Sequence, residues 1–325
     1  MQAIVQQKIA AKPLDSISYS GTAHNLFIDG AQVSGCNARF NTKKYFRNSQ
    51  FFQPWGSNVT YWRYWKLNAT PFTSDPSQAL FRGATVEEAL ARIEFLISNR
   101  RQVASLLGVS GVGKSTLLQY CASNPLISRE VPTLQVVRTS IFGLREGDLL
   151  IELATRLCGT RAVNDQRVAW QALRDYFRAA FREGVQTALL IDDTESASAA
   201  GEADLIRLLS VPLPLTVIFA VETPMASAVS RVLFDRCELQ IELPGWDYSQ
   251  TAEFLGWTTQ RLGRQEPIFT DTAVSRIQEL SQGIARRVIQ IADLSLVAGA
   301  VQQAQYVDHD CIEQVAFELP RTAAA

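Results

Sequence analysis

The stretch that decides the fold covers residues 103–118 and reads VASLLGVSGVGKSTLL. Gly108, Gly113, Lys114 and Ser115 satisfy the phosphate-loop pattern G-x-x-x-x-G-K-[ST]. An apolar run precedes the loop and a helix-compatible segment follows it, which is the strand–loop–helix setting that the motif requires. At average residue frequencies, a chance match is expected in on the order of one percent of chains of this length. The stretch therefore predicts a site for the phosphates of a nucleoside triphosphate.

The residues of this loop have separate expected tasks. Glycines let the backbone wrap closely around phosphate oxygens, so that N–H groups and the helix N-terminus face negative charge. We expect the Lys114 ammonium to reach the β- and γ-phosphates of ATP, and the Ser115 hydroxyl to ligate Mg²⁺. The loop residues predicted to bind the nucleotide are Gly108, Ser110, Gly111, Val112, Gly113, Lys114, Ser115 and Thr116.

The composition limits the class of protein. The chain has 325 residues, of which 47% are hydrophobic and 19% charged, which is typical of a globular protein with about two domains. A net charge of −1 excludes a global basic field, although a local basic groove stays open. Five scattered cysteines without a C-x-x-C pair fit a reducing compartment rather than a disulfide framework or zinc site. Because no apolar run approaches ~20 residues, we expect a cytoplasmic protein without an integral membrane segment.

A second stretch, TALLIDD over residues 187–193, predicts the strand whose carboxylate would hold Mg²⁺ beside the phosphate loop. Four apolar residues followed by Asp192 are typical of a buried parallel strand with a carboxylate at its tip. Ligands bind at the carboxyl ends of strands in open α/β sheets. We therefore expect Asp192 to hold Mg²⁺ with Ser115, and Asp193 to orient the attacking water or take its proton.

The remaining pattern predicts a parallel sheet covered by helices, because strands alternate with helical segments. A buried strand over residues 215–221 ends in Glu222 and Thr223. Such a residue can position the water or simply cap the strand. Five strands are expected, around residues 103–107, 134–137, 187–193, 215–221 and 239–243.

After residue 244 the pattern changes to helices only, with N-cap candidates at Asp247, Thr270 and Asp308. We therefore expect three regions: an N-terminal extension over 1–53, either disordered or a small irregular hairpin, an α/β nucleotide-binding domain over 54–244, and an all-α lid over 245–325. The start of one lid helix, GIARR over residues 283–287, carries two cations that oppose the helix dipole. A triphosphate bound at the domain junction would explain them.

An aromatic-rich segment over residues 55–81, called the leader below, precedes the first helix of the nucleotide-binding domain. Two interpretations stay open: its rings fasten the leader to the following domain, or one or two of them also line an adenine pocket. Thr85 is expected to cap the next helix, with Glu88 as its capping-box partner. The leader aromatics are Trp55, Tyr61, Trp62, Tyr64, Trp65, Phe72 and Phe81.

Over about residues 64–319 the chain resembles AAA+ ATPases, in particular the group related to the ExeA/GspA-type secretion ATPase. The resemblance rests on KLNATPFTSDPSQALF (66–81), GVSGVGKST, ALLIDD and the lid pattern that ends in GIARRVIQIADLSL. It implies an AAA+ fold, in which Lys114 and Ser115 are the Walker A pair and Asp192 is the Walker B magnesium residue. Similar ATPases serve secretion, DNA transposition and replication initiation.

The resemblance also implies roles for four further positions. Asp193 stands where the family usually has Glu, and a carboxylate shorter by one methylene sits about an ångström further back, which is enough to cost rate. Glu222 or Thr223 falls near the sensor-1 position. Arg236 matches the arginine that a neighbouring subunit offers to the γ-phosphate, and Arg286 matches the lid (sensor-2) arginine.

Two functions follow from these residues. The first is an ATPase that oligomerises on nucleotide, hydrolyses ATP at subunit junctions with Asp193, Lys114, Arg236 and Glu222, and drives or gates a protein partner. The alternative is a nucleotide-gated adaptor with DNA as its partner and slow or absent hydrolysis. The sequence does not identify the partner or the process served.

Overall fold

The computed structural model describes residues 27–28, 31–32, 61–72, 79–124, 133–159, 164–211 and 213–319. The chain divides into two compact units, Met1–Asn58 and Val59–Ala325. In the first unit, strands β1 (Phe27–Ile28) and β2 (Ala31–Gln32) form an antiparallel pair. The rest of the extension expected over residues 1–53 lies outside the described residues.

The second unit contains the expected five-stranded parallel sheet, with strand order β4-β5-β6-β3-β7. The strand that leads into the phosphate loop pairs with β6 on one side and β7 on the other, and Gly108 is in register with Glu222. This order brings the carboxyl ends of β5, β6 and β3 side by side. The strands are β3 (Val103–Gly108), β4 (Leu134–Ser140), β5 (Gln186–Asp192), β6 (Leu215–Glu222) and β7 (Leu239–Glu242).

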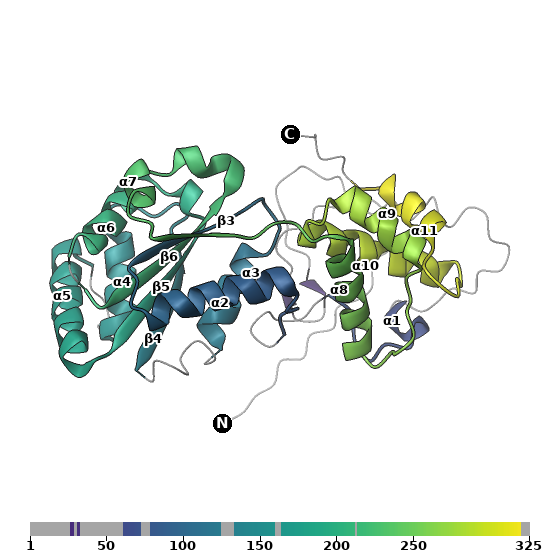
Figure 1. The fold of residues 1–325 in the computed structure, drawn as a ribbon, viewed down its shortest axis with the longest axis horizontal. Coiled ribbons are helices and arrows are strands. Elements are labelled where there is room, and N and C mark those ends of the chain that lie inside the picture. Colours follow the sequence, from purple (N-terminus) through teal and green to yellow (C-terminus); the bar gives the residue numbers. More distant parts are fainter. Residues whose placement is uncertain are drawn as a thin grey trace, which may run out of the picture. The chain divides into compact units, whose positions relative to one another are not determined.

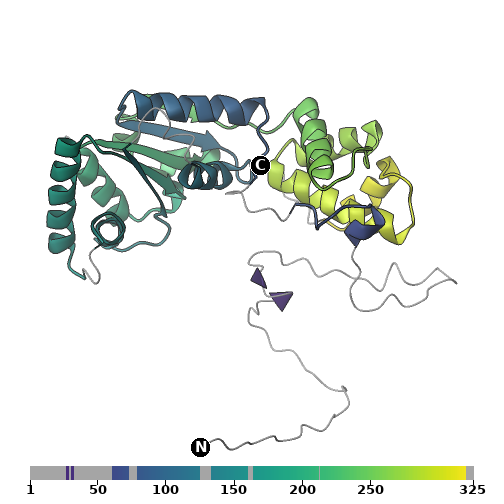
Figure 2. The same cartoon turned by 90° about the horizontal axis from the view of Figure 1, so that it is seen from below.

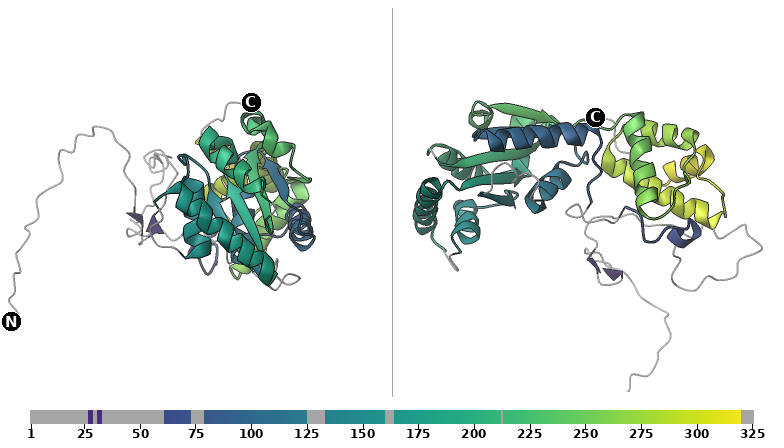
Figure 3. Two further views of the ribbon diagram at one scale, coloured as in Figure 1. Left: turned by 90° about the vertical axis from the view of Figure 1, so that its left-hand side faces the viewer. Right: turned by 60° about the horizontal axis from the view of Figure 1, so that its bottom comes forward.

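Helices cover both faces of this sheet (Figure 1). Alternate residues of β6 point to opposite sides, so that Val217 and Phe219 pack into one core and Ile218 and Ala220 into the other. The first core includes residues of α4, α5, α6 and α7, and the second includes α2 and α3. Figure 2 and Figure 3 show the same layers from other directions. The helices are α2 (Ala84–Ser98), α3 (Lys114–Ser123), α4 (Asp148–Cys158), α5 (Gln166–Glu183), α6 (Ala199–Leu209) and α7 (Arg231–Phe234).

The chain after β7 forms the helical region that the sequence predicted. Asp247 caps the first of these helices in a capping box with Gln250, and the Thr270 and Asp308 side chains each accept a backbone N–H at a helix start. All three N-cap predictions are confirmed. The lid, as we call this region, contains α8 (Tyr248–Arg261), α9 (Asp271–Ser281), α10 (Ala285–Val301) and α11 (His309–Ala316).

The described aromatic residues of the leader pack into the lid and not onto the domain that follows in sequence, which corrects the first interpretation above. Trp55 lies outside the described residues. Trp65 is 1% exposed in the lid core, and its indole N–H donates to the Leu296 carbonyl of α10 at 2.8 Å. The Tyr61 hydroxyl, on α1 (Tyr61–Tyr64), donates to Asp293 of the same helix. Phe72 and Phe81 make their ring contacts with aromatic residues of 246–257. The aromatic partners of these two rings lie far away in the sequence, so the leader sequence alone does not reveal them.

The expected cap at Thr85 is also corrected. The N-cap of helix α2 is Gly83, two residues before the predicted cap, and it makes no side-chain capping bond. The Thr85 hydroxyl instead accepts a hydrogen bond from the Gln250 side chain at 2.7 Å, and Glu88 pairs with Arg92 one turn later. A contact between the lid and α2 has replaced the local capping interaction.

Candidate nucleotide-binding site

The phosphate loop has a backbone conformation that requires its glycines. Gly111 and Gly113 have φ of +84° and +112°, in the left-handed region that residues with a Cβ rarely adopt. At Gly108, an added Cβ would lie 2.7 Å from the Leu243 carbonyl oxygen. Gly113 precedes α3 without a side-chain cap, and Ser115 in the first turn is exposed. The first turn of α3 therefore offers backbone N–H groups and a hydroxyl to an anion.

Lys114 lies over the loop with its ammonium bound to loop carbonyls. Its Nζ donates to the Gly108 oxygen at 2.8 Å and to the Val109 oxygen at 3.2 Å, and the residue is 9% exposed. Burial lowers the pKa of Lys114, while the nearby carboxylates of Glu222, Glu195 and Asp192 oppose that shift. The charges of three acidic groups thus act on one buried ammonium. The site already contains the positive charge that a phosphate would need.

Asp192 ends β5 as predicted and is almost fully buried at 3% exposure. Its Oδ2 accepts a hydrogen bond from the Arg138 guanidinium of β4 at 2.8 Å, and its Oδ1 accepts the Asp193 N–H at 3.2 Å. Arg138 also donates to Gln119 of α3 at 2.9 Å. No motif in the sequence points to Arg138, because its role depends on the pairing of β4 with β5.

The oxygen donors at this edge suit Mg²⁺ held jointly by the protein and a nucleotide. Among the described residues, no group of three or more His, Cys, Asp or Glu side chains could hold a metal ion. Mg²⁺ commonly takes one or two carboxylates together with substrate phosphates and waters. The carboxylate of Asp192 and the hydroxyl of Ser115 match that donor set in kind.

Asp193 is turned toward β4. It has a left-handed φ of +54°, and its Oδ2 accepts a hydrogen bond from Ser140 at 2.8 Å. Two residues later, in the short 3₁₀ helix η3 (Thr194–Ser196), Glu195 accepts the backbone N–H of Glu222 at 3.3 Å. The sequence analysis missed Glu195. Its only signal was an acidic residue three positions after Asp192, in the run DDTES.

The expected lid arginine lies at the loop. The Arg286 N–H donates to the Gly111 oxygen at 3.0 Å, and a Cβ added to Gly111 would lie 3.0 Å from the Arg286 Cβ. The charge of Arg286 lowers the pKa of Lys114, so the two cations are close enough to interact. The start of α10 and the phosphate loop therefore form one site.

Arg236 is placed elsewhere. It follows α7 at the amino edge of the sheet, where the neighbouring Glu238 N–H bonds the Val103 oxygen. Its guanidinium donates to the Leu209 oxygen of α6 at 2.8 Å, so it is engaged within its own chain. Arg231 of α7, by contrast, has a side chain that is 92% exposed. The structure does not bring Arg236 to the loop of the same chain.

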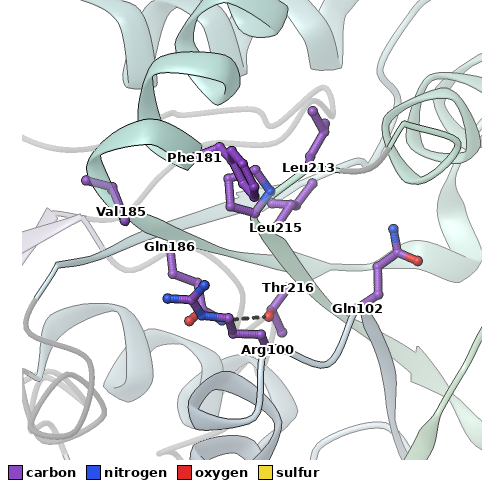
Figure 4. A pocket seen from close by; sticks show the side chains of 10 residues that line it. Arg100, Gln102, Phe181, Val185, Gln186, Leu213, Leu215 and Thr216 are labelled. Carbon is purple, nitrogen blue, oxygen red and sulfur yellow. Dashed lines mark hydrogen bonds between the residues drawn. The ribbon is translucent and has the colours of Figure 1, made fainter.

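Two hollows help to locate the site. The one drawn in Figure 4, about 320 Å³, is lined by Phe181, Gln186 and Thr216. It lies at the starts of β5 and β6, the opposite edge from the phosphate loop. A smaller hollow of about 170 Å³ lies beside the loop and is lined by residues 107–109, 242–245 and Thr223. Of these two hollows, the second has the position suited to the nucleotide.

Comparison of sequences finds a relative among secretion proteins. General secretion pathway protein A of Aeromonas hydrophila is 22% identical over 273 residues, which cover 80% of this chain and 48% of that protein. The chain spans about half the length of this relative. No protein-family model matches the chain.

Solved structures show the same fold at low sequence identity. Drosophila ORC bound to DNA has a TM-score of 0.58 and 17% identity, over 82% of this chain and 68% of that chain. The ORC2 protein of Aeropyrum pernix in ADPNP–ADP complexes has a TM-score of 0.56 and 15% identity, over 80% and 72%. A point mutant of Thermotoga maritima RuvB has a TM-score of 0.51 and 17% identity, over 74% and 71%.

Within the part of the chain that the structure describes, no helix has the length and apolar character needed to cross a membrane. The phosphate loop on β3, the carboxylate at the tip of β5 and the helical lid agree with the similarities above. The chain has the fold of an AAA+ P-loop ATPase and resembles the general secretion pathway A proteins over most of its length.

Proposed function

We propose that this protein binds ATP with Mg²⁺ and hydrolyses it. The observation that carries the proposal is the buried Lys114 ammonium, which is bound to a carbonyl of the phosphate loop and is acted on by the charges of Asp192, Glu195 and Glu222. Such a group suits a triphosphate tail, whose negative charge the ammonium and the loop N–H groups would neutralise. Scattered free cysteines support a cytoplasmic location.

Different residues of the site would bind the metal, bind the phosphates and orient the attacking water in this reaction. Ser115 and Asp192 would hold the Mg²⁺, which neutralises charge on the β- and γ-phosphate oxygens when bound. Lys114 and Arg286 would bind phosphate oxygens from the loop and from the lid. Asp193, Glu222 and Glu195 are the carboxylates available to orient the attacking water.

We also propose that nucleotide promotes assembly of several copies and that the assembly acts on a protein partner. Arg236 would then serve the site of a neighbouring copy, as the resemblance implies. It must first leave the Leu209 carbonyl. Arg231 of α7, the helix that precedes Arg236, is already exposed and is the matched comparison. Loss of activity in Arg236→Ala but not in Arg231→Ala supports the assignment, and the reverse result contradicts it.

The test of the function is phosphate release by the purified protein and by Lys114→Ala. Lys66→Ala serves as the control, because Lys66 is an exposed lysine outside the site. We expect release by the wild type and the control, and a loss of at least about 100-fold in Lys114→Ala. Equal rates in all three proteins would refute the proposal.

A second candidate is the nucleotide-gated DNA adaptor with slow or absent hydrolysis. The observation in its favour is Asp193, which is shorter than the glutamate of the resembled family and is bound to Ser140. Retention of duplex DNA with ATP but not with ADP, lost steeply as salt rises, would support it because phosphate contacts are salt-dependent. Turnover that rises in Asp193→Glu would instead show that the short carboxylate limits a working ATPase.

A further inference from the structure

The acidic residues after β5 face different strands. Asp193 is bound to Ser140 of β4, which lies on the side of β5 away from the phosphate loop. Glu195 is bound to the backbone of Glu222 at the tip of β6, which lies between β5 and β3. The second carboxylate is therefore directed toward the loop and the first away from it.

A short chain of contacts joins Glu195 to the phosphate-binding ammonium. Its Oε2 accepts the Glu222 N–H at 3.3 Å, and Glu222 is in register with Gly108 of β3. The Gly108 carbonyl in turn accepts the Lys114 Nζ at 2.8 Å. The Glu195 charge also acts on Lys114, where it raises the pKa against the effect of burial.

We propose that Glu195, and not Asp193, is the general base of ATP hydrolysis in this protein. The inference rests on the proposed function and assigns one step of it. A proton leaves the attacking water for the Glu195 carboxylate while the water oxygen bonds to the γ-phosphorus. The bond from that phosphorus to the β,γ-bridging oxygen breaks, its electron pair stays on the oxygen, and ADP leaves.

The competing interpretation is that Glu195 only fastens η3 to the tip of β6. Glu195→Gln separates the two, because an amide oxygen can still accept the Glu222 N–H but cannot take a proton from water. Asp193→Asn removes the other candidate base. Glu183→Gln, an exposed charge at the end of α5, controls for the loss of one carboxylate.

We expect Glu195→Gln to lower kcat by about 10²–10⁴-fold, the usual contribution of a general base. Asp193→Asn should lose less than about tenfold, and Glu183→Gln should match the wild type. A readout without turnover accompanies these rates: after incubation with ATP and gel filtration, Glu195→Gln should retain ATP where the wild type retains ADP. Its affinity for a fluorescent ATP analogue and its thermal midpoint should stay near the wild-type values.

Two results would overturn the inference and leave the ATPase function intact. One is Lys114-dependent hydrolysis that falls less than about tenfold in Glu195→Gln. The other is a loss of about 100-fold or more in Asp193→Asn with little loss in Glu195→Gln. Absence of any Lys114-dependent hydrolysis in the wild type would remove the proposed function, and the inference with it.

Discussion

The ion pair between Arg138 and Asp192 gives the sharpest test of the site's electrostatics. The Asp192 side chain is 4% exposed and that of Arg138 is 31% exposed, with 2.8 Å between Nη2 and Oδ2. Replacing Arg138 with Met removes the cation and leaves a buried carboxylate with the Asp193 N–H as its remaining partner. Breaking a fully buried pair costs roughly 3–5 kcal/mol. Because Arg138 is partly solvated, we expect about 2 kcal/mol without ligand.

This loss should be visible in thermal unfolding and should shrink when Mg²⁺–ATP is added. For a region of this size about 2 kcal/mol corresponds to a fall in Tm of roughly 4–8 °C. A ligand at 100 times its Kd restores about 2.7 kcal/mol, and a metal at Asp192 would also replace the missing positive charge. Mg²⁺–ATP should therefore raise the Tm of Arg138→Met more than that of the wild type.

The matched control is Arg178→Met, because the pair of Arg178 with Asp175 is exposed on both sides at 3.3 Å. Exposed pairs contribute little, so this variant should stay within about 0.5 kcal/mol of the wild type. A double variant that also carries Asp192→Asn should recover part of the loss of Arg138→Met, since no buried charge is then left unpaired. Equal stability of Arg138→Met and wild type without ligand would refute the reasoning.

Three further predictions concern the lid, the loop and the thiols. Trp65→Ala should destabilise the lid by about 3–5 kcal/mol in urea unfolding, because the indole is fully buried in its core; an unchanged midpoint would contradict this. Gly111→Ala should weaken ATP binding by at least about tenfold in a fluorescence titration, since it strains a φ of +84°. Gly256→Ala on α8, which has open space around it, should bind ATP normally. Burial raises the pKa of Cys121 to about 12, so mass spectrometry should find it unalkylated at pH 8 in the folded protein. Burial also raises the pKa of Cys158, but this thiol is only half-buried and should react before Cys121.

The sequence predicts those features that depend on neighbours along the chain. The strand–loop–helix form of residues 103–118, the five strands and the N-caps at Asp247, Thr270 and Asp308 are all confirmed, and each is a local pattern of a few residues. The Thr85 cap was also a local prediction, and it was wrong because a residue of the lid competes for the same hydroxyl.

Features that depend on strand order were not predictable in the same way. The partner of Asp192 is Arg138 because β4 happens to lie beside β5, and no spacing in the sequence contains that information. Glu195, which follows β5, contacts the backbone of Glu222 because β6 is the neighbour of β5 on the side of the phosphate loop. The roles of Arg236 and Glu222 stay predictions.

The leader gives the lid an unusual connectivity. The polypeptide enters the lid with α1 and Trp65, departs to build the nucleotide-binding sheet, and returns after β7. The lid and the sheet are thus joined by two peptide tethers, one before α2 and one before α8. A double tether permits bending about the line between its two attachments and resists rotation about other axes, so we expect any movement of Arg286 relative to the sheet to follow a single arc. A protein shortened to begin at residue 79 would keep one tether, would have a cavity in the lid core at the position of Trp65, and would lose the restriction to a single arc.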